Sequence, residues 1–168
     1  MPHILIGALT MALSMFPQTP TIAAPCTGPE YHQFDLFIGD WDTFDVGAPT
    51  VLTARNHVTA MLDGCAVREV YVQLDGLRGE SFSTYDATRK VWHQSWVTNH
   101  GALLLLEGRF EKDRMVLIAP ERAASGATTL LRAIWWVEGA TVRERAERST
   151  DNGRTWGPVF DIVFRRHH

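Results

Sequence analysis

The sequence predicts an all-β protein: a closed up-and-down antiparallel barrel of about ten strands with a short N-terminal helix. Strand-like runs separated by Gly-, Asn- and Asp-containing turns follow one another from residue 41 to the end of the chain. No connection is long enough for the crossover helix that parallel strands require, so neighbouring strands must be antiparallel. Closing so many strands into a barrel also removes the exposed edges of an open sheet.

Composition limits the classes of function. The chain has 168 residues, 45% of them hydrophobic, which suits one domain with a substantial core. Its formal net charge is −3. This gives no basic surface for phosphates, so we expect no nucleic-acid partner. No apolar run reaches the ~18–20 residues of a transmembrane helix, so we expect no membrane span.

The N-terminal region has the pattern of an export signal. An apolar stretch covers residues 4–16 and is followed by Pro17 and Pro20. Small residues at Thr21 and Ala23 suit signal-peptidase cleavage after Ala23. The alternative is a buried N-terminal helix. We expect a periplasmic or secreted protein. The expected division is a signal peptide at 1–23, a tail at 24–30 and a barrel domain at 31–168.

The remaining elements follow in order. Residues 30–38 form the only convincing helical turn, because Phe34, Phe37 and Ile38 fall on one face and Gly39 ends it. Asp63-Gly64 is a strong signal for a type I′ hairpin turn. The expected strands are 41–46, 51–62, 65–74, 81–86, 91–98, 102–110, 114–119, 128–137, 141–148 and 159–165.

Two cysteines, Cys26 and Cys65, would meet in an oxidising compartment after export. They could form a disulfide that ties the mature N-terminal tail to the barrel wall, or remain two free thiols. Neither belongs to a C-x-x-C motif, so a redox or zinc site is not indicated. The His and Asp residues also lack metal-ligand spacing, and we expect neither a metal nor another cofactor.

Alternation along the strands predicts which side chains face the lumen. In residues 141–149 one face is strongly charged and must meet solvent, so Val142, Glu144 and Ala146 point inward, with Arg148 near a rim. Trp92, Gln94 and Trp96 share one face of their strand and suggest a half-polar pocket wall. For residues 65–74 the choice between the face of Glu69 and Tyr71 and the opposite face stays open.

The run 103–106 is Leu at every position and is therefore apolar on both faces. Such a strand needs a cover on its outer face as well. The candidates are the N-terminal turn and a partner chain, which would include the second copy of a homodimer.

Several short motifs occur in a fixed order. They are Phe34-Asp35-Leu36-Phe37-Ile38-Gly39-Asp40-Trp41-Asp42, Leu62-Asp63-Gly64-Cys65 with Glu69, Ser81 with Tyr85-Asp86, Trp92-x-Gln94-x-Trp96-Val97, Met115, Arg132 with Trp135, Val142-Arg143, and residues 149–156. Together they make residues 31–166 resemble a bacterial lipocalin-like family of largely unassigned function. The resemblance implies a calycin-like barrel closed by the N-terminal helix, and no reaction. It covers Asn56, Glu69, Ser81, Tyr85, Trp92, Gln94, Trp96 and Arg132.

Two residues depart from the family pattern. Glu144 stands where a neutral Gln is expected and adds a carboxylate to the lumen, whereas Ala146 stands where a large aromatic is expected and enlarges it. Residues 149–156 also match the Asp-box hairpin of sialidase propellers. A propeller needs several copies, so we interpret this single copy as a structural hairpin clamp with no glycosidase activity.

We therefore predict an exported barrel that binds a small hydrophobic or aromatic molecule with a polar end. The candidate ligand-binding residues are Asn56, Glu69, Tyr71, Ser81, Tyr85, Trp92, Gln94, Trp96, Arg132 and Glu144. The main alternative is a cofactor-independent lyase, isomerase or cyclase. It would use Glu69 or Glu144 as general base, with Tyr85 or Arg132 stabilising developing charge. In the competing interpretation, Arg132 neutralises one of the two carboxylates and the other faces a wet opening. A third possibility is a structural protein whose lumen is simply core.

Overall fold

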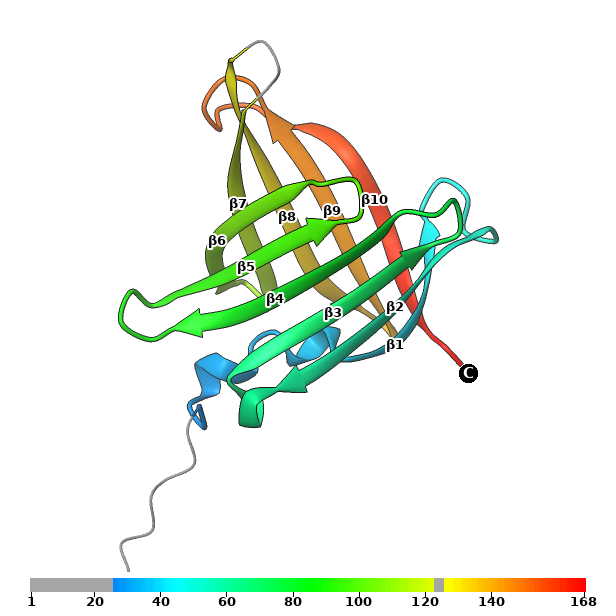
Figure 1. The fold of residues 1–168 in the computed structure, drawn as a ribbon, viewed down its shortest axis with the longest axis horizontal. Helices are drawn as coiled ribbons and strands as arrows, with labels where there is room; N and C mark the ends of the chain where they lie inside the picture. Colours follow the sequence, from blue (N-terminus) through cyan, green and yellow to red (C-terminus); the bar gives the residue numbers. More distant parts are fainter. Residues whose placement is uncertain (1–25, 123–125) are drawn as a thin grey trace, which may run out of the picture.

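The structure, a computed structural model, describes residues 26–122 and 126–168. This part of the chain forms ten strands that close into one antiparallel barrel, with each strand beside its neighbour in sequence (Figure 1). The expected fold class is confirmed. The strands are β1 (Gly39–Asp45), β2 (Leu52–Met61), β3 (Ala66–Gln73), β4 (Arg78–Asp86), β5 (Val91–Thr98), β6 (Leu103–Glu111), β7 (Arg114–Arg122), β8 (Thr128–Glu138), β9 (Thr141–Ser149) and β10 (Gly157–Arg166).

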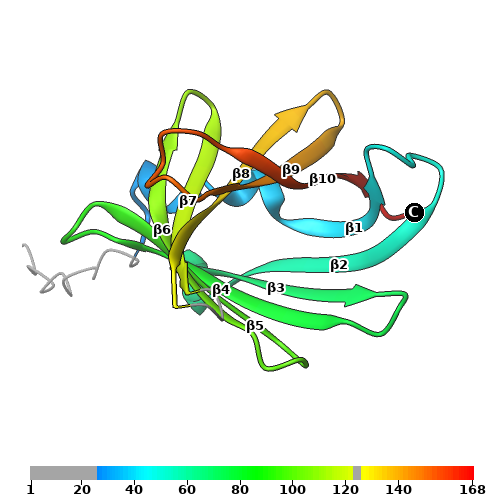
Figure 2. The ribbon, with the colours of Figure 1, turned by 90° about the horizontal axis from the view of Figure 1, so that it is seen from above.

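The first and last strands close the barrel. β1 pairs with β10 from Trp41 opposite Arg166 to Asp45 opposite Ile162, and the two strands lie side by side in both views (Figures 1 and 2). The Arg166 guanidinium lies 3.9 Å from the centre of the Trp41 ring and donates a hydrogen bond to the Ile38 carbonyl. The Arg166 guanidinium, stacked on Trp41, therefore covers the seam at the start of β1 and the end of β10.

The segment before β1 plugs one end of the barrel. It forms two short 3₁₀ helices, η1 (Pro29–His32) and η2 (Asp35–Phe37), instead of one continuous helical turn. The predicted apolar face is nevertheless buried, because Phe34 and Phe37 are almost completely inaccessible to solvent. The Trp41 indole N–H donates to the Phe37 carbonyl at 2.8 Å and fixes η2 against the barrel. No helix in the described ranges is both long and apolar enough to cross a bilayer.

A disulfide between Cys26 and Cys65 holds this plug, with 5.1 Å between the two Cα atoms. Cys65 follows the short helix η3 (Leu62–Gly64) in the β2–β3 turn, where Asp63 and Gly64 both have positive φ as a type I′ turn requires. Of the two cysteine alternatives, the disulfide is thus the one that forms. The expected signal peptide and the tail up to residue 25 lie outside the described residues.

The core is concentrated at the plugged end. There the Phe34 ring packs against Trp92 and Trp135, with centroid-to-centroid distances of 5.7 and 5.3 Å. On the outer wall, by contrast, Leu103 and Leu105 are 61% and 51% exposed. The N-terminal turn packs inside the barrel end and does not cover them, so that expectation was wrong. A partner chain over this face stays a prediction.

Candidate functional site

A cavity of about 390 Å³ occupies the barrel beyond the plug. It reaches the end of the barrel where β1, β3 and β5 finish, because Asp45, Gln73 and Trp96 from those strand ends line it. Ala133 and Ala146 stand directly opposite each other in the β8–β9 ladder and both face the cavity. These two small side chains leave the space open, in agreement with the prediction that Ala146 enlarges the lumen.

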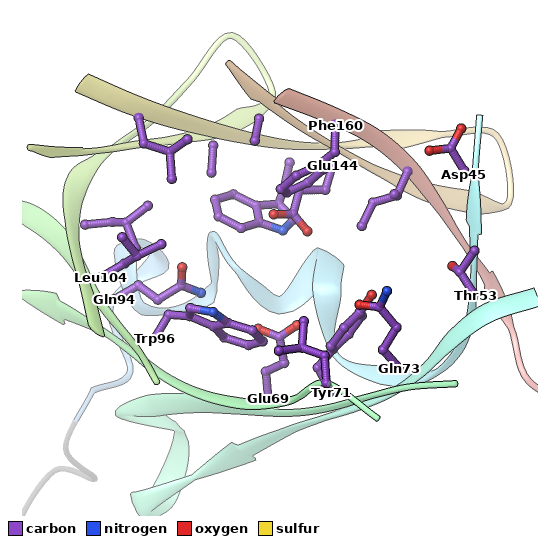
Figure 3. A pocket seen from close by; sticks show the side chains of 17 residues that line it. Asp45, Thr53, Glu69, Tyr71, Gln73, Gln94, Trp96, Leu104, Glu144 and Phe160 are labelled. Atoms are coloured by element: carbon purple, nitrogen blue, oxygen red, sulfur yellow. The ribbon is translucent and has the colours of Figure 1, made fainter. Parts of the chain in front are cut away.

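The inward faces predicted for β5 and β9 are confirmed, and the structure resolves β3. Glu69 and Tyr71 point into the cavity from β3, across from Glu144 on β9 (Figure 3). Trp96 joins the same wall as Tyr71, with the two ring centroids 6.0 Å apart. Gln94 also borders the space. Five of the predicted ligand-binding residues therefore meet in one cavity.

Trp96 is positioned by a glycine on the neighbouring strand. A Cβ atom at Gly79 would lie 2.2 Å from the Trp96 ring, so the indole lies directly on the backbone of β4. Only glycine permits so close an approach without displacing the ring. The Trp96 indole therefore lies flat against the barrel wall and does not fill the lumen.

Trp92 and Tyr85 lie on the predicted inward side but at the plugged end, away from the large cavity. The Trp92 indole N–H donates to Gln33 Oε1 at 3.0 Å, and Tyr85 packs edge-on against Tyr31. Together with Gln33 they line a separate space of about 160 Å³. Trp92 is therefore core beneath the lumen, and the expected pocket wall of two Trp flanking a Gln is reduced to Gln94 and Trp96.

A chain of hydrogen bonds joins four inward polar side chains across β2 to β5. Gln94 Nε2 donates to Ser81 Oγ at 3.3 Å, and Ser81 Oγ donates to Glu69 Oε2 at 2.9 Å. Asn56 Nδ2 donates to Glu69 Oε1 at 2.8 Å, and the buried Asn56 Oδ1 has no partner among the described residues. Asn56 and Ser81 thus hold Glu69 in place from behind the cavity wall.

Both lumen carboxyls are hard to ionise. Burial raises the pKa of Glu69 above its usual value, although the hydrogen bonds from Asn56 and Ser81 oppose the change. Burial also raises the pKa of Glu144 well above its usual value, and repulsion from Glu69 adds to this. The Glu144 side chain borders the cavity and is partly accessible there. The surrounding strands nevertheless keep its carboxyl away from bulk solvent.

Tyr71 responds to the same charges. Burial, followed by the nearby carboxylates of Glu144 and Glu69, raises the pKa of Tyr71 to about 12. Its phenol is therefore protonated at neutral pH and available as a hydrogen-bond donor on the cavity wall.

Trp135 is a cavity residue that the candidate list missed. It stands opposite Glu144 in the β8–β9 ladder and lines the lumen. Its indole N–H interacts with Glu144 and lowers that carboxyl's pKa against the effect of burial, although the contact falls outside strict hydrogen-bond geometry within the described structure. Its alternation with Ala133 could have revealed its orientation, but β8 is apolar on both faces and so does not show which face is inner.

Arg132 lies on the outer face of β8. Its guanidinium donates to Glu147 and stacks 4.0 Å from the centre of the Trp156 ring. The interpretation in which Arg132 neutralises a lumen carboxylate is therefore wrong, and Arg132 cannot stabilise charge inside the cavity from this position. The alternation of side chains along β8 could not show which face Arg132 lies on, because both faces of this strand carry apolar side chains.

The Asp-box hairpin is a structural clamp, as predicted. The Asp151 carboxylate accepts the backbone N–H groups of Arg154 and Thr155 at 3.0 and 2.9 Å. The hydroxyl and amide of Thr155 are the main reasons that the pKa of Asp151 falls to about 2. Trp156 donates to the Gly153 carbonyl beneath the turn. Across the described residues no cluster of His, Cys, Asp and Glu is arranged to hold a metal.

Replacing Glu144 by Gln is expected to flatten the pH dependence of stability. In the unfolded chain this carboxyl ionises near its ordinary pKa of 4.5, and in the folded protein only at a higher pH. Between those values the native state holds more protons than the unfolded state. The free energy of unfolding therefore falls as pH rises, by at most about 1.4 kcal/mol per pH unit for one carboxyl. Denaturant titrations across this range should show a smaller fall for Glu144→Gln.

Glu69 keeps part of the slope in that variant, because its pKa is raised too. The control is Glu111→Gln, which removes an exposed carboxylate at the end of β6. It should leave the slope of the parent protein unchanged. Identical slopes for Glu144→Gln and the parent would show that Glu144 ionises normally in the folded state.

Comparisons with other proteins identify no family for this barrel. No protein-family model matches the chain, and no curated protein is recognisably similar to it in sequence.

Proposed function

We propose that this protein is an exported member of the bacterial lipocalin-like family that binds a small molecule in its lumen. The ligand is partly aromatic or apolar and has a polar end. The observation that carries this is the cavity wall itself, where the polar groups of Glu69, Glu144, Gln94 and Tyr71 converge among the aromatic rings of Trp96 and Trp135.

The shape and lining of the cavity support the same proposal. Its volume of about 390 Å³ lies in the range of small-molecule pockets, and its walls are mostly apolar with a few polar groups. Trp96 and Phe160 offer ring faces, while Gln94 and Tyr71 offer groups that orient a polar end. Export is supported by the Cys26–Cys65 disulfide, which is typical of oxidising compartments.

One observation favours a cofactor-independent enzyme as the second candidate. Glu144 combines a raised pKa with a place on the wall of the cavity, which a second carboxyl, Glu69, also lines. A base of this kind could remove a proton from a carbon next to a carbonyl. Such a lyase or isomerase would rely on Glu144 or Glu69, since Tyr85 and Arg132 lie outside the large cavity.

A lumen-filling variant tests the proposed function. The probe is N-phenyl-1-naphthylamine, an uncharged apolar fluorophore that excited tryptophans can sensitise. We expect saturable binding with one site per chain, and Ala146→Phe should weaken it at least tenfold because the new ring occupies the cavity. Titrations monitored by probe emission and by quenching of tryptophan emission measure the effect.

The matched control is Val137→Phe, which adds the same ring at an exposed position on β8. It should bind the probe as the parent does. Absence of saturable binding to the parent, or equal binding by Ala146→Phe, would contradict a ligand site in the lumen. Near-ultraviolet circular dichroism of both variants verifies that the barrel is folded.

A further inference from the structure

The charged groups of the cavity are all of one sign. Its described lining includes the carboxyls of Asp45, Glu69 and Glu144, and it contains no Lys, Arg or His. Asp45 belongs to the open end, whereas Glu69 and Glu144 lie deeper and approach the central space from opposite walls (Figure 3). Two buried carboxyls with no cationic partner are costly to ionise unless something brings a positive charge to them.

The arginines nearest in sequence do not supply that charge. Arg143 and Arg145 flank Glu144 on β9, but alternation turns both to the outer face, where each donates to Asp161 at 2.7 Å. Arg132 likewise pairs with Glu147 outside the barrel. The positive charges of this wall are therefore already engaged by outer carboxylates, and within the described part of the chain no cation compensates the lumen carboxyls.

Aromatic rings complete the setting. Tyr71, Trp96, Trp135 and Phe160 all line the same space as the two carboxyls. Ring faces carry negative electrostatic potential and attract ammonium groups, most strongly where water is excluded. The cavity therefore offers both formal and partial negative charge, together with apolar surface for a carbon skeleton.

We propose that the polar end of the ligand is a cation, a protonated or quaternary amine, seated between Glu69 and Glu144 against the aromatic walls. This inference rests on the proposed function and adds the charge of the ligand to it. An aromatic or alkyl amine fits, because its skeleton packs on Trp96 and Leu104 while its nitrogen meets the carboxylates. A ligand carboxylate is disfavoured, because it would add a further negative charge to a space lined by three acidic side chains and no basic one among the described residues.

Binding of a cation should be linked to proton release. Glu144 must ionise to pair with the ligand, so affinity for a permanently charged amine rises with pH through the pKa of Glu144. The other titratable groups that face this space are Glu69 and Tyr71 on β3 and Asp45 on β1. Glu69 acts in the same direction, and Tyr71, with a pKa of about 12, stays protonated at neutral pH.

The test uses one skeleton with four end groups: tryptamine, its N,N,N-trimethyl derivative, the neutral alcohol tryptophol and the anion indole-3-acetate. Calorimetric titration at neutral pH should give at least tenfold tighter binding of both cations than of tryptophol, and no binding of indole-3-acetate. Glu144→Gln should weaken the cations at least tenfold and leave tryptophol unchanged. The trimethyl derivative should bind more tightly as pH rises.

Glu111→Gln is the control for loss of a negative charge outside the lumen, and it should bind all four compounds as the parent does. Tryptophol binding as tightly as tryptamine, or an unchanged cation preference in Glu144→Gln, would overturn the cationic assignment. If N-phenyl-1-naphthylamine binds but neither cation does, the lumen site stands and only its charge preference fails. If nothing binds, the proposed function fails as well.

Discussion

Removal of the Cys26–Cys65 disulfide is expected to lower the free energy of unfolding by about 3–4 kcal/mol. The two cysteines are 39 residues apart in sequence, so their bond closes a long loop in the unfolded chain and restricts its freedom. Loss of the bond also removes the covalent link between the plug, which consists of η1 and η2, and the β2–β3 turn. The measurement is urea denaturation of the parent protein with and without reductant, and of a Cys26→Ser/Cys65→Ser variant.

The double variant should match the reduced parent, and reductant should leave it unchanged. Limited proteolysis gives a second readout, because the N-terminal segment should be cut faster once the bond is absent. If the oxidised and reduced proteins have the same denaturation midpoint and the same cleavage rate, the disulfide does not stabilise the plug.

Phe34→Ala is expected to destabilise the barrel by about 3–5 kcal/mol, the usual cost of removing a buried aromatic side chain. Phe34 is completely buried and packs edge-to-face against both Trp92 and Trp135. Trp135 also lines the lumen, so its loss of support should change the floor of the binding cavity. Urea denaturation measures the stability, and near-ultraviolet circular dichroism reports the altered environment of the two indoles.

Leu103→Ala is the comparison, since it truncates an apolar side chain that is 61% exposed. That change should alter the free energy of unfolding by no more than about 0.5 kcal/mol. A cost below about 1 kcal/mol for Phe34→Ala would mean that the plug contributes little to the fold, in contradiction to its packing.

The fold could be predicted because local patterns determine most of it. Turn signals such as Asp63-Gly64 mark strand ends. The alternation of charged and less polar side chains in residues 141–149 shows which face of β9 meets solvent. The helical plug was predicted only in part, because the buried spacing of Phe34 and Phe37 is compatible with a 3₁₀ helix as well as an α-helix. Side-chain burial determines that an element packs, but backbone hydrogen bonds determine its type.

The site was harder to predict. The alternation of side chains along a strand shows which face of the strand a residue lies on, but not how far along the barrel axis it lies. Trp92 and Trp96 share a face of β5, yet one packs against the plug and the other lines the lumen. Their difference depends on where the N-terminal segment enters the barrel, and no pattern within β5 contains that information. On β8, Arg132 and Trp135 could not be assigned to the inner or the outer face, because apolar residues occur on both faces of the strand.

The pairing of β1 with β10 has a consequence for how the molecule folds. Trp41 meets Arg166, and the Asp40 carbonyl accepts the His167 amide, so the first strand finds its final neighbour only when β10 is present. Such distant contacts slow folding, and barrels rich in them fold over roughly milliseconds to seconds. During synthesis β1 therefore keeps one unpaired edge until β10 emerges, which makes a chain stalled before β10 prone to aggregation.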